Sequence, residues 1–456
     1  MSPPVQEELN GDTAYVSLLH GDRVEFWLYA LMLGHRLRQL DQATPRVLLV
    51  ARPTEDYAAP FLEGMSYKCL QALWEVRPVD LVDAAAADKT RRKRHRYVFT
   101  KLRVFEVPYK HIMFFDLDVV VRRDPSELFK VSAPAGMYHG RWDRSEFASH
   151  GGLLPQEAFE KDDCVRGCVN AGLLRLDPPV TSVERRELLD EMLREVAKLK
   201  EDDQSYLPEQ YFLVKQIPNW HHIKVAWNCE VNPRWSVVER HKGNSKLEKC
   251  REVIKAELPR DWFELCETQE QLRSVGMFHF SGLWLQPWWY LNMPPTEAHQ
   301  QLKKQFDKRD PPGMVALAVA EWLLAAQELK ESAVFSEDET YCFKQQLGML
   351  ERTAEKWWDG VQSCNACGAI QDDYDESCEE CEVSAHLARV VERSESATVS
   401  TSKGRRQNWD LGGNKKRRQR KKAEKDSMEL AESRCRRPSP ALRPRIQETF
   451  ASVNLV

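Results

Sequence analysis

The sequence is built around an apolar segment with two carboxylates at its centre, His111-Ile112-Met113-Phe114-Phe115-Asp116-Leu117-Asp118-Val119-Val120-Val121. Its β-branched and aromatic residues are typical of a buried central strand, and the run is too short and too apolar for a surface helix. Side chains alternate along a strand, so Asp116 and Asp118 leave the same side while Leu117 packs on the other. We therefore predict a buried parallel strand that ends in a carboxylate pair.

The carboxylate pair predicts a metal site. Adjacent carboxylates in an apolar setting repel each other and are costly to bury unless a cation lies between them. A hard divalent ion, Mg²⁺ or Mn²⁺, suits these oxygen ligands and can also hold a diphosphate. The same residues also fit a solvated turn at the end of a strand, continued by the polar residues 122–125.

Composition and charge narrow the class of protein. The 456 residues are 42% hydrophobic and 30% charged, an ordinary globular balance, and the chain is long enough for more than one unit. A net charge of −4 predicts no general affinity for nucleic acid.

We expect neither a signal peptide nor a transmembrane segment, since the most apolar stretch, residues 315–324, is far short of the ~20 residues of a spanning helix. Twelve cysteines in such a chain favour reduced thiols or metal ligands in a cytoplasmic or nuclear setting.

The N-terminal part alternates short apolar runs with helical periodicity. This pattern predicts strand–helix–strand units of an open, parallel, Rossmann-like sheet, in which ligands collect at the carboxyl ends of the strands. The expected strands are residues 14–19, 46–50 and 74–79, and the expected helices are residues 26–39 and 61–73.

Polar residues recur at the ends of later apolar runs. A basic cluster at residues 90–96 fits contacts to phosphates, and equally fits a solvated loop or a nuclear-import signal. Lys101 is the stronger candidate for phosphate, because it begins a helix that leads into the Asp116 strand. Further candidates are Asn170 on a strand, Glu209 and Gln210 in the first turn of a helix, Asn228, and His279 near the end of a strand.

Taken in order, these motifs resemble the glycogenin-type retaining glycosyltransferases of family 8, which have the GT-A fold. The resemblance spans roughly residues 13 to 292, about two-thirds of the chain, and its individual motifs are short. They are Tyr15-Val16-Ser17-Leu18-Leu19, Thr100-Lys101-Leu102, Phe115-Asp116-Leu117-Asp118, Asn170-Ala171-Gly172, Glu209-Gln210, Trp227-Asn228, and His279-Phe280-Ser281-Gly282 followed by Pro287-Trp288.

The resemblance implies a role for each matching residue. Asp116, Asp118 and His279 would bind Mn²⁺, a set of oxygen and imidazole ligands that suits this ion or Mg²⁺. Asn170, Glu209 and Gln210 would contact the donor sugar and the reaction site. The UDP-sugar would also be held by Tyr15, Leu18 and Leu19 at the uracil and ribose, by Lys101, and by the segment that ends at Gly282.

Two departures from the family pattern bear on activity. Gln286 stands where the family has a lysine that grips the diphosphate, so that contact is missing or comes from Arg92, Arg94 or Lys101. Glu209 replaces the usual aspartate and is one methylene longer. These changes leave the expected fold intact and affect turnover and donor identity.

The implied reaction transfers a hexose from a UDP-sugar to an acceptor hydroxyl with retention at the anomeric carbon. The acceptor is a glycan, a protein or a small-molecule hydroxyl. We favour same-face attack with Glu209 and Gln210 positioning the sugar, and Glu209 is the better nucleophile if a covalent intermediate forms. Two alternatives stay open, namely an inactive GT-A scaffold that binds partners and a nucleic-acid-binding protein that uses the basic runs.

The C-terminal third predicts three further parts beyond a domain at residues 13–292. Residues 293–360 have helical periodicity and fit an extension packed on the main domain. Residues 361–385 hold two Cys-x-x-Cys pairs, which predict a structural zinc module that binds a protein partner, with a redox dithiol as the alternative. The expected ligands are Cys364, Cys367, Cys378 and Cys381. Residues 386–456 are basic and lack apolar periodicity, which predicts a disordered tail.

Overall fold

The computed structural model describes residues 9–54, 59–83, 96–139, 149–155, 159, 168–199, 208–231, 269–281, 285–306 and 313–360. The chain divides into two compact units, Met1–Asp372 and Asp373–Val456, and every described residue lies in the first. Within these described ranges, no helix combines the length and the apolar character that crossing a membrane requires.

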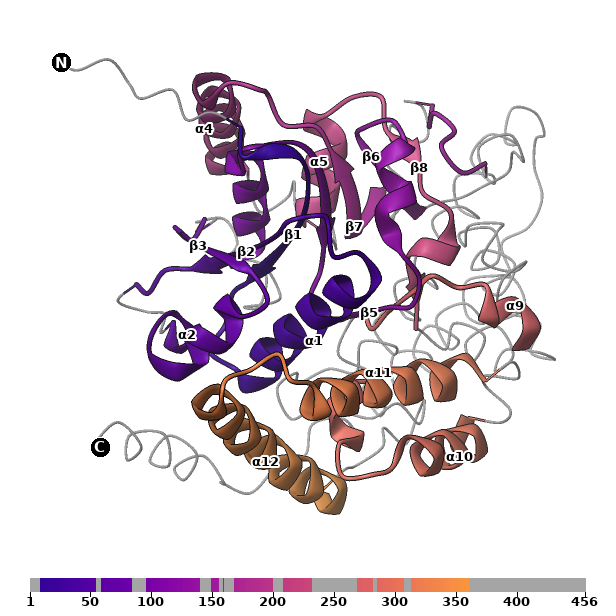
Figure 1. Ribbon diagram of the computed structural model, residues 1–456. Helices are drawn as coiled ribbons and strands as arrows, with labels where there is room; N and C mark the ends of the chain where they lie inside the picture. The colour runs from indigo at the N-terminus through magenta and orange to yellow at the C-terminus, as the bar shows by residue number, and fades with distance from the viewer. Residues whose placement is uncertain are drawn as a thin grey trace, which may run out of the picture. The chain divides into compact units, whose positions relative to one another are not determined.

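A seven-stranded mixed sheet forms the centre of the described unit (Figure 1). Its strand order is β3-β2-β1-β4-β7-β6-β8. Strands β3, β2, β1 and β4 are mutually parallel, whereas β7 runs antiparallel to both of its neighbours. The predicted α/β class with a largely parallel sheet is confirmed. The strands are β1 (Gly11–Leu19), β2 (Arg46–Ala51), β3 (Glu75–Val79), β4 (Tyr109–Phe115), β6 (Ala135–His139), β7 (Cys168–Leu176) and β8 (His221–His222).

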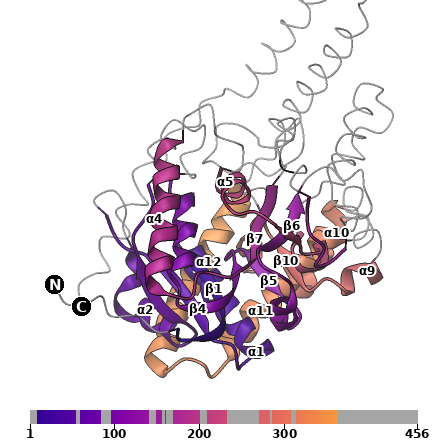
Figure 2. The same ribbon diagram turned by 90° about the horizontal axis from the view of Figure 1, so that it is seen from above.

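A second, three-stranded sheet corrects one prediction. The apolar segment 111–121 is two strands in different sheets, because β4 ends at Phe115 and β5 (Val119–Val121) pairs antiparallel with β10 (Met277–His279). Strand β9 (Cys229–Glu230) completes this sheet beside β10, and Figure 2 shows β5 and β10 side by side. The backbone bends between the sheets at residues 116–118, which carry the two aspartates.

Helices cover both faces of the large sheet. Helix α1 (Val24–Leu40) packs on β1 and β2, while α4 (Ser182–Lys198), α5 (Pro208–Gln216) and the 3₁₀ helix η4 (Val98–Glu106) share a core with the opposite face. Alternation along the strands explains this division, since every second residue of β1 faces the η4 side. That core includes Ala14, Val16 and Leu18 of β1, Phe99 and Leu102 of η4, and Leu189, Met192 and Val196 of α4.

Local features of the sequence explain where the helices of this core begin. Helix α4 begins at a capping box, in which the Thr181 hydroxyl accepts from the Glu184 amide and the Glu184 side chain accepts in return. Helix α5 lies beside β7 in both views (Figures 1 and 2). Its first turn, which contains Glu209 and Gln210, is buried against the sheet.

The predicted helical extension is present. It consists of α10 (Pro295–Phe306), α11 (Met314–Glu331) and α12 (Glu337–Gly360). Helix α11 packs on α1 and β5, and Arg122 beside β5 pairs with Glu321 at 3.3 Å. Helix α12 packs on α1 and on α2 (Gly64–Gln71). The remaining elements are α9 (Gln269–Arg273), η1 (Pro60–Leu62), η5 (Pro125–Lys130), η8 (Val225–Trp227) and η9 (Pro287–Tyr290).

Candidate functional site

The loop between β4 and β5 is held in place through its backbone. The amide of Asp116 donates to the carbonyl of Gly172 on β7 at 3.0 Å, and the carbonyl of Asp118 accepts from the amide of Phe280, just after β10, at 2.8 Å. Each aspartate is therefore tied to a different sheet. Because backbone groups provide these contacts, neither carboxylate is needed to hold the loop.

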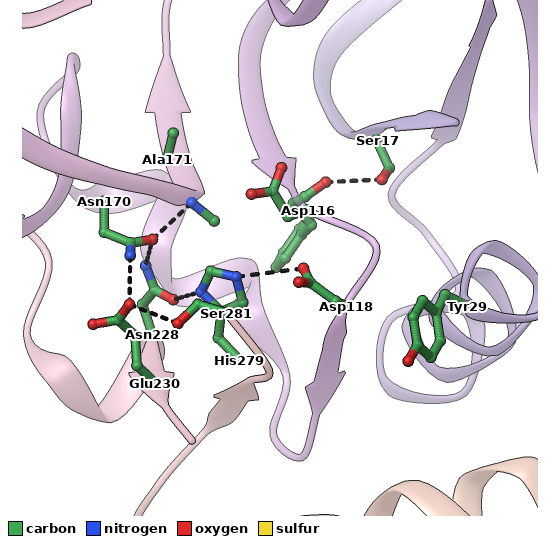
Figure 3. Close-up of polar contacts among 12 residues, drawn as sticks. Ser17, Tyr29, Asp116, Asp118, Asn170, Ala171, Asn228, Glu230, His279 and Ser281 are labelled. Atoms are coloured by element: carbon green, nitrogen blue, oxygen red, sulfur yellow. Dashed lines mark hydrogen bonds and ion pairs between the residues drawn. The ribbon is translucent and has the colours of Figure 1, made fainter. Parts of the chain in front are cut away.

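His279 joins the two aspartates to form the predicted cluster. One ligand atom from each of Asp116, Asp118 and His279 lies within 4.8 Å of the others. His279 Nε2 is 3.4 Å from Asp118 Oδ1, and Figure 3 shows the imidazole pointing toward this carboxylate. His279 is buried at the end of β10, whereas both aspartates are half-buried. Two carboxylates and one imidazole form a donor set that fits Mn²⁺ or Mg²⁺.

A chain of amides fixes the tautomer of His279. The backbone N–H of Gly172 donates to Asn170 Oδ1 at 2.8 Å, so this oxygen is an acceptor and the amide orientation of Asn170 is set. Asn228 Nδ2 donates to the same oxygen at 2.9 Å, which leaves Asn228 Oδ1 to accept from His279 Nδ1 at 2.9 Å. A histidine that donates from Nδ1 presents the lone pair of Nε2 toward Asp118 when it is neutral. The orientation of the imidazole thus follows from one backbone amide.

The other end of this chain is a buried carboxylate. Glu230 Oε1 accepts from Asn170 Nδ2 at 3.2 Å and from the Ser281 hydroxyl at 2.7 Å. Figure 3 shows Asn170, Asn228, Glu230 and Ser281 on the side of His279 away from Asp118. Asn170 is predicted to contact the donor sugar. In this structure its side-chain oxygen binds Asn228, the residue that accepts from His279.

Gly172 is required by the position of the imidazole. A Cβ atom at this residue would lie 2.2 Å from Cε1 and 2.4 Å from Nδ1 of His279. Real Cβ atoms do not approach other atoms so closely, and the histidine is fixed by Asn228. The glycine of the Asn-Ala-Gly segment therefore makes room for the histidine.

The electrostatic balance of the cluster raises the pKa of His279. Burial lowers this pKa, but the charge of Asp118, its hydrogen bond to the imidazole, and the charges of Asp116 and Glu230 together outweigh burial. The surroundings of His279 are therefore strongly negative, and a divalent cation placed among the three ligands would relieve this excess.

Lys101 places one positive charge next to the aspartates of the cluster. Its Nζ lies 2.8 Å from an oxygen of Asp116 and 3.3 Å from the carbonyl oxygen of Ala171. Burial lowers the pKa of Lys101. The negative charges of Asp116 and then Glu209 raise this pKa by a larger amount, so the net shift is upward. The helix predicted around Lys101 is the 3₁₀ helix η4, and it leads directly into β4. Lys101 thus lies between the aspartate loop and the first turn of α5.

Glu209 and Gln210 reach the same region from α5. Both side chains are buried, and Gln210 Nε2 donates to Glu209 Oε1 at 3.4 Å. Burial raises the pKa of Glu209, Lys101 opposes this shift, and the charge of Asp116 adds to it. Glu209 is therefore a carboxyl group that is easier to protonate than usual and lies near the cluster.

The strand-1 residues do not all face the cluster. Leu18 and Leu19 end β1 on the edge of the sheet where Asp116 follows β4. Tyr15 is instead fully buried, and its hydroxyl donates to Asp41 Oδ2 at 2.8 Å. Its ring packs against Phe115 and Phe129. Tyr15 belongs to the core, so we do not include it in the proposed donor site.

Gln286 has a partner within the protein. The Tyr29 hydroxyl on α1 donates to Gln286 Oε1 at 2.8 Å, and both residues are buried. Burial and then the charges of Asp118 and Glu25 raise the pKa of Tyr29 well above its ordinary value. Figure 3 shows Tyr29 on the opposite side of Asp118 from His279. A neutral tyrosine–glutamine pair thus stands where the family pattern has a lysine.

Several predicted residues lie outside the described ranges. They are Gly282, the basic-cluster residues Arg92 and Arg94, and the expected zinc ligands Cys364, Cys367, Cys378 and Cys381. The zinc module, its protein partner and the basic tail remain predictions.

Sequence reasoning missed residues that reach the cluster from neighbouring elements. Glu230 and Tyr29 were not among the predicted site residues. His20 also lies in the field of the cluster, since burial and the charge of Lys101 lower its pKa while Asp116 opposes them. One signal was available for Glu230, because it follows Asn228 by two positions in an extended segment and so shares its face. Tyr29 falls within the helical periodicity of α1 and carries no separate signal.

Comparisons with known proteins give partial matches. No family model matches the chain. An uncharacterised protein of Acanthamoeba polyphaga mimivirus is 25% identical over 201 residues, 43% of this chain and 66% of that protein. Inositol phosphorylceramide glucuronosyltransferase 1 of Arabidopsis thaliana is 31% identical over 136 residues, 28% of this chain and 23% of that protein. The chain thus spans less than two-thirds of the length of either relative.

Similar solved structures include three glycosyltransferases. The bifunctional glycosyltransferase WbbM has a TM-score of 0.38 and 15% identity, over 63% of this chain and 48% of that one. The galactosyltransferase LgtC, in complex with donor and acceptor sugar analogues, has a TM-score of 0.35 and 15% identity, over 61% and 89%. Mouse xyloside xylosyltransferase 1 has a TM-score of 0.33 and 14% identity, over 59% and 98%. All three TM-scores are below 0.5.

Proposed function

We propose that this chain is a GT-A glycosyltransferase that moves a hexosyl group from a UDP-sugar to an acceptor hydroxyl with retention. The supporting observation is the cluster of Asp116, Asp118 and an oriented His279 at the carboxyl edge of a parallel strand, beside the Lys101–Glu209 pair. The local similarity to a glucuronosyltransferase is in keeping with sugar transfer.

The proposed metal ligands are Asp116, Asp118 and Nε2 of His279. A bound Mn²⁺ or Mg²⁺ would supply positive charge to stabilise the leaving nucleoside diphosphate. Asn228 keeps the histidine in the metal-binding tautomer, and the backbone contacts of residues 116 and 118 hold the carboxylates in place. The negative field that raises the pKa of His279 favours cation binding at this point.

Lys101 and α5 would order the donor. Lys101 is held by Asp116 and by the Ala171 carbonyl, and its ammonium group would bind a phosphate of the donor. Glu209 and Gln210 would bind the hexose hydroxyls, with Asn170 beside them. The acceptor hydroxyl would then attack the anomeric carbon from the face that UDP leaves, and its proton would pass to the leaving phosphate, which gives retention.

A second function is favoured by one observation. Gln286 is held by Tyr29 and has no charge to offer a diphosphate, which suits a domain that binds partners without turnover. The intact cluster of Asp116, Asp118 and His279 favours the active enzyme.

The deciding experiment measures UDP release from a panel of UDP-sugars, with Mn²⁺ or with EDTA. The chain is tested with small-molecule and glycan acceptors and without any acceptor. We expect release from one donor that depends on metal and is lost in Asp118→Asn. The matched control is Asp80→Asn, which removes an exposed carboxylate paired with Arg52 at 2.9 Å and should leave release unchanged. If no donor is cleaved and calorimetry detects no donor binding, the scaffold function replaces the enzyme.

A further inference from the structure

Two cysteines face each other where α2 meets α12, helices that lie together in Figure 1. Cys69 of α2 lies with its Sγ 3.5 Å from the carbonyl oxygen of Glu339, one turn before Cys342 on α12. In the reverse direction, Cys342 Sγ lies 3.8 Å from the hydroxyl of Ser66, one turn before Cys69 on α2. Each thiol therefore reaches the other helix at the level of its partner cysteine.

The helix contact around these thiols is well fixed. Trp27 of α1 donates from Nε1 to the Ser66 carbonyl at 3.1 Å, and its ring lies 6.2 Å from that of Phe343, centroid to centroid. The residues on either side of the pair are thus anchored to the same tryptophan. The thiols are held together by packing and do not meet by chance motion of a loop.

The two thiols differ in access to solvent. Cys69 is fully buried, whereas Cys342 is partly exposed. A reagent in solution therefore reaches Cys342 first. Cys69 can react only with a group that is already attached at Cys342.

The two thiols also differ in acidity. The neighbouring Cys69 thiol and the Ser66 hydroxyl lower the pKa of Cys342 to about 6, although burial acts in the opposite direction. The neighbouring Cys342, together with burial, raises the pKa of Cys69. The accessible sulfur is therefore the more acidic of the two, which is the division of roles between an attacking and a resolving cysteine.

We propose that Cys342 and Cys69 form a thiol–disulfide exchange site that reacts with low-molecular-weight disulfides such as oxidised glutathione. This site is separate from the proposed glycosyl transfer and does not depend on it. In the first step the Cys342 thiolate attacks one sulfur of glutathione disulfide. The S–S bond of the reagent breaks, one glutathione thiolate leaves, and a mixed disulfide forms on Cys342.

In the second step Cys69 resolves the mixed disulfide. It gives up its proton to the released glutathione thiolate, and its sulfur attacks Cys342 Sγ. The second glutathione leaves as a thiolate and takes a proton from water. Two electrons pass from the cysteine pair to the reagent, and a disulfide now joins α2 to α12. The oxidised form therefore holds α12 against α2, which itself packs on β3.

The test treats the folded full-length chain with excess oxidised glutathione at pH 7 and maps its disulfides by mass spectrometry. Mapping is needed because the chain has twelve cysteines. Trypsin places the two residues on separate peptides, 69–89 and 331–344, and each of these contains a single cysteine. We expect the two peptides to be joined in the native chain. Cys69→Ser should instead accumulate a stable glutathione adduct on Cys342, and Cys342→Ser should leave Cys69 unmodified.

A second measurement follows the alkylation of Cys342 by iodoacetamide with pH. The rate should change little between pH 7 and pH 9, whereas an ordinary thiol of pKa near 8.5 reacts about 25-fold faster at the higher pH. Cys229, which is fully buried on β9, serves as the control and should stay unmodified until the chain is unfolded. The proposal is overturned if the native chain keeps a glutathione adduct on Cys342 without linking the peptides. Failure of Cys342 to react at all would overturn it as well.

Discussion

Gly172 and His279 approach each other so closely that a methyl group at position 172 would overlap the imidazole, with Cβ 2.2 Å from Cε1. The glycine belongs to β7 and the histidine to β10, so this contact joins the two sheets at the proposed metal site. The substitution Gly172→Ala should displace His279 and weaken Mn²⁺ binding measured by calorimetry. The strain of inserting one carbon into a packed site should also lower the free energy of unfolding by about 1–3 kcal/mol.

A glycine without such a neighbour provides the control for this substitution. Gly348 lies in α12, and a Cβ atom there would meet only the flexible end of Arg352 at 3.5 Å. Gly348→Ala should stabilise the helix by about 0.5–1 kcal/mol and leave Mn²⁺ affinity unchanged. Equal Mn²⁺ affinities for the native chain and Gly172→Ala would show that His279 is not a ligand.

The amide chain behind His279 should contribute to metal affinity without touching the metal. In Asn228→Ala the imidazole loses the acceptor of its Nδ1 proton, so the Nε2 lone pair is no longer held toward Asp118. Loss of such a supporting hydrogen bond typically costs about 10–100-fold in metal affinity. Calorimetric titration with Mn²⁺ measures this loss. Asn292→Ala removes an exposed amide bonded to the Glu351 carbonyl and should bind Mn²⁺ as the native chain does.

The Lys101–Asp116 ion pair should be replaced by the metal. In Lys101→Met the Asp116 carboxylate loses a partner at 2.8 Å, and the metal-free protein should lose about 2 kcal/mol of stability. Saturating Mn²⁺ restores a positive charge next to Asp116, so the difference in Tm between variant and native chain should shrink. Scanning calorimetry in EDTA and in Mn²⁺ tests this, with the exposed Lys198→Met as the control. A deficit of the same size under both conditions would separate Lys101 from the metal site.

Glu209→Gln should make stability less dependent on pH. Burial raises the pKa of Glu209 in the folded chain above its ordinary value of 4.5, so ionisation destabilises the fold. The native chain carries this cost fully above the folded pKa and loses it as pH falls toward the unfolded value. Glu209→Gln should therefore be the more stable protein at neutral pH, and the gap should close in acid.

Urea unfolding between pH 4 and pH 8 measures this gap. The control is Glu191→Gln at an exposed position in the middle of α4, where the same change of charge is made at the surface. A gap at Glu209 that widened in acid would mean that the folded state prefers the charged carboxylate.

The sequence by itself determined the elements of the main sheet and the residues that collect at its edge. Short apolar runs, helical periodicity and helix starts are local properties, so β1, β2, α1 and α5 follow from neighbouring residues. The pairing of Asp116 and Asp118 with a distant His279 came from motif order and is found in the structure as a cluster. Tyr15, from the same motif order, turned out to be a core residue bonded to Asp41.

Tertiary structure alone decided how the segment 111–121 divides between two sheets. Both halves are equally apolar, so composition cannot show that Phe115 pairs with Ser17 and Leu173 while Val119 pairs with His279. The same holds for the Tyr29–Gln286 bond and the contact of Cys69 with the Cys342 helix, which join residues more than 250 positions apart. Strand pairing and helix packing depend on which surfaces meet in the folded chain, and the free energy of that match is not encoded in the periodicity of either partner.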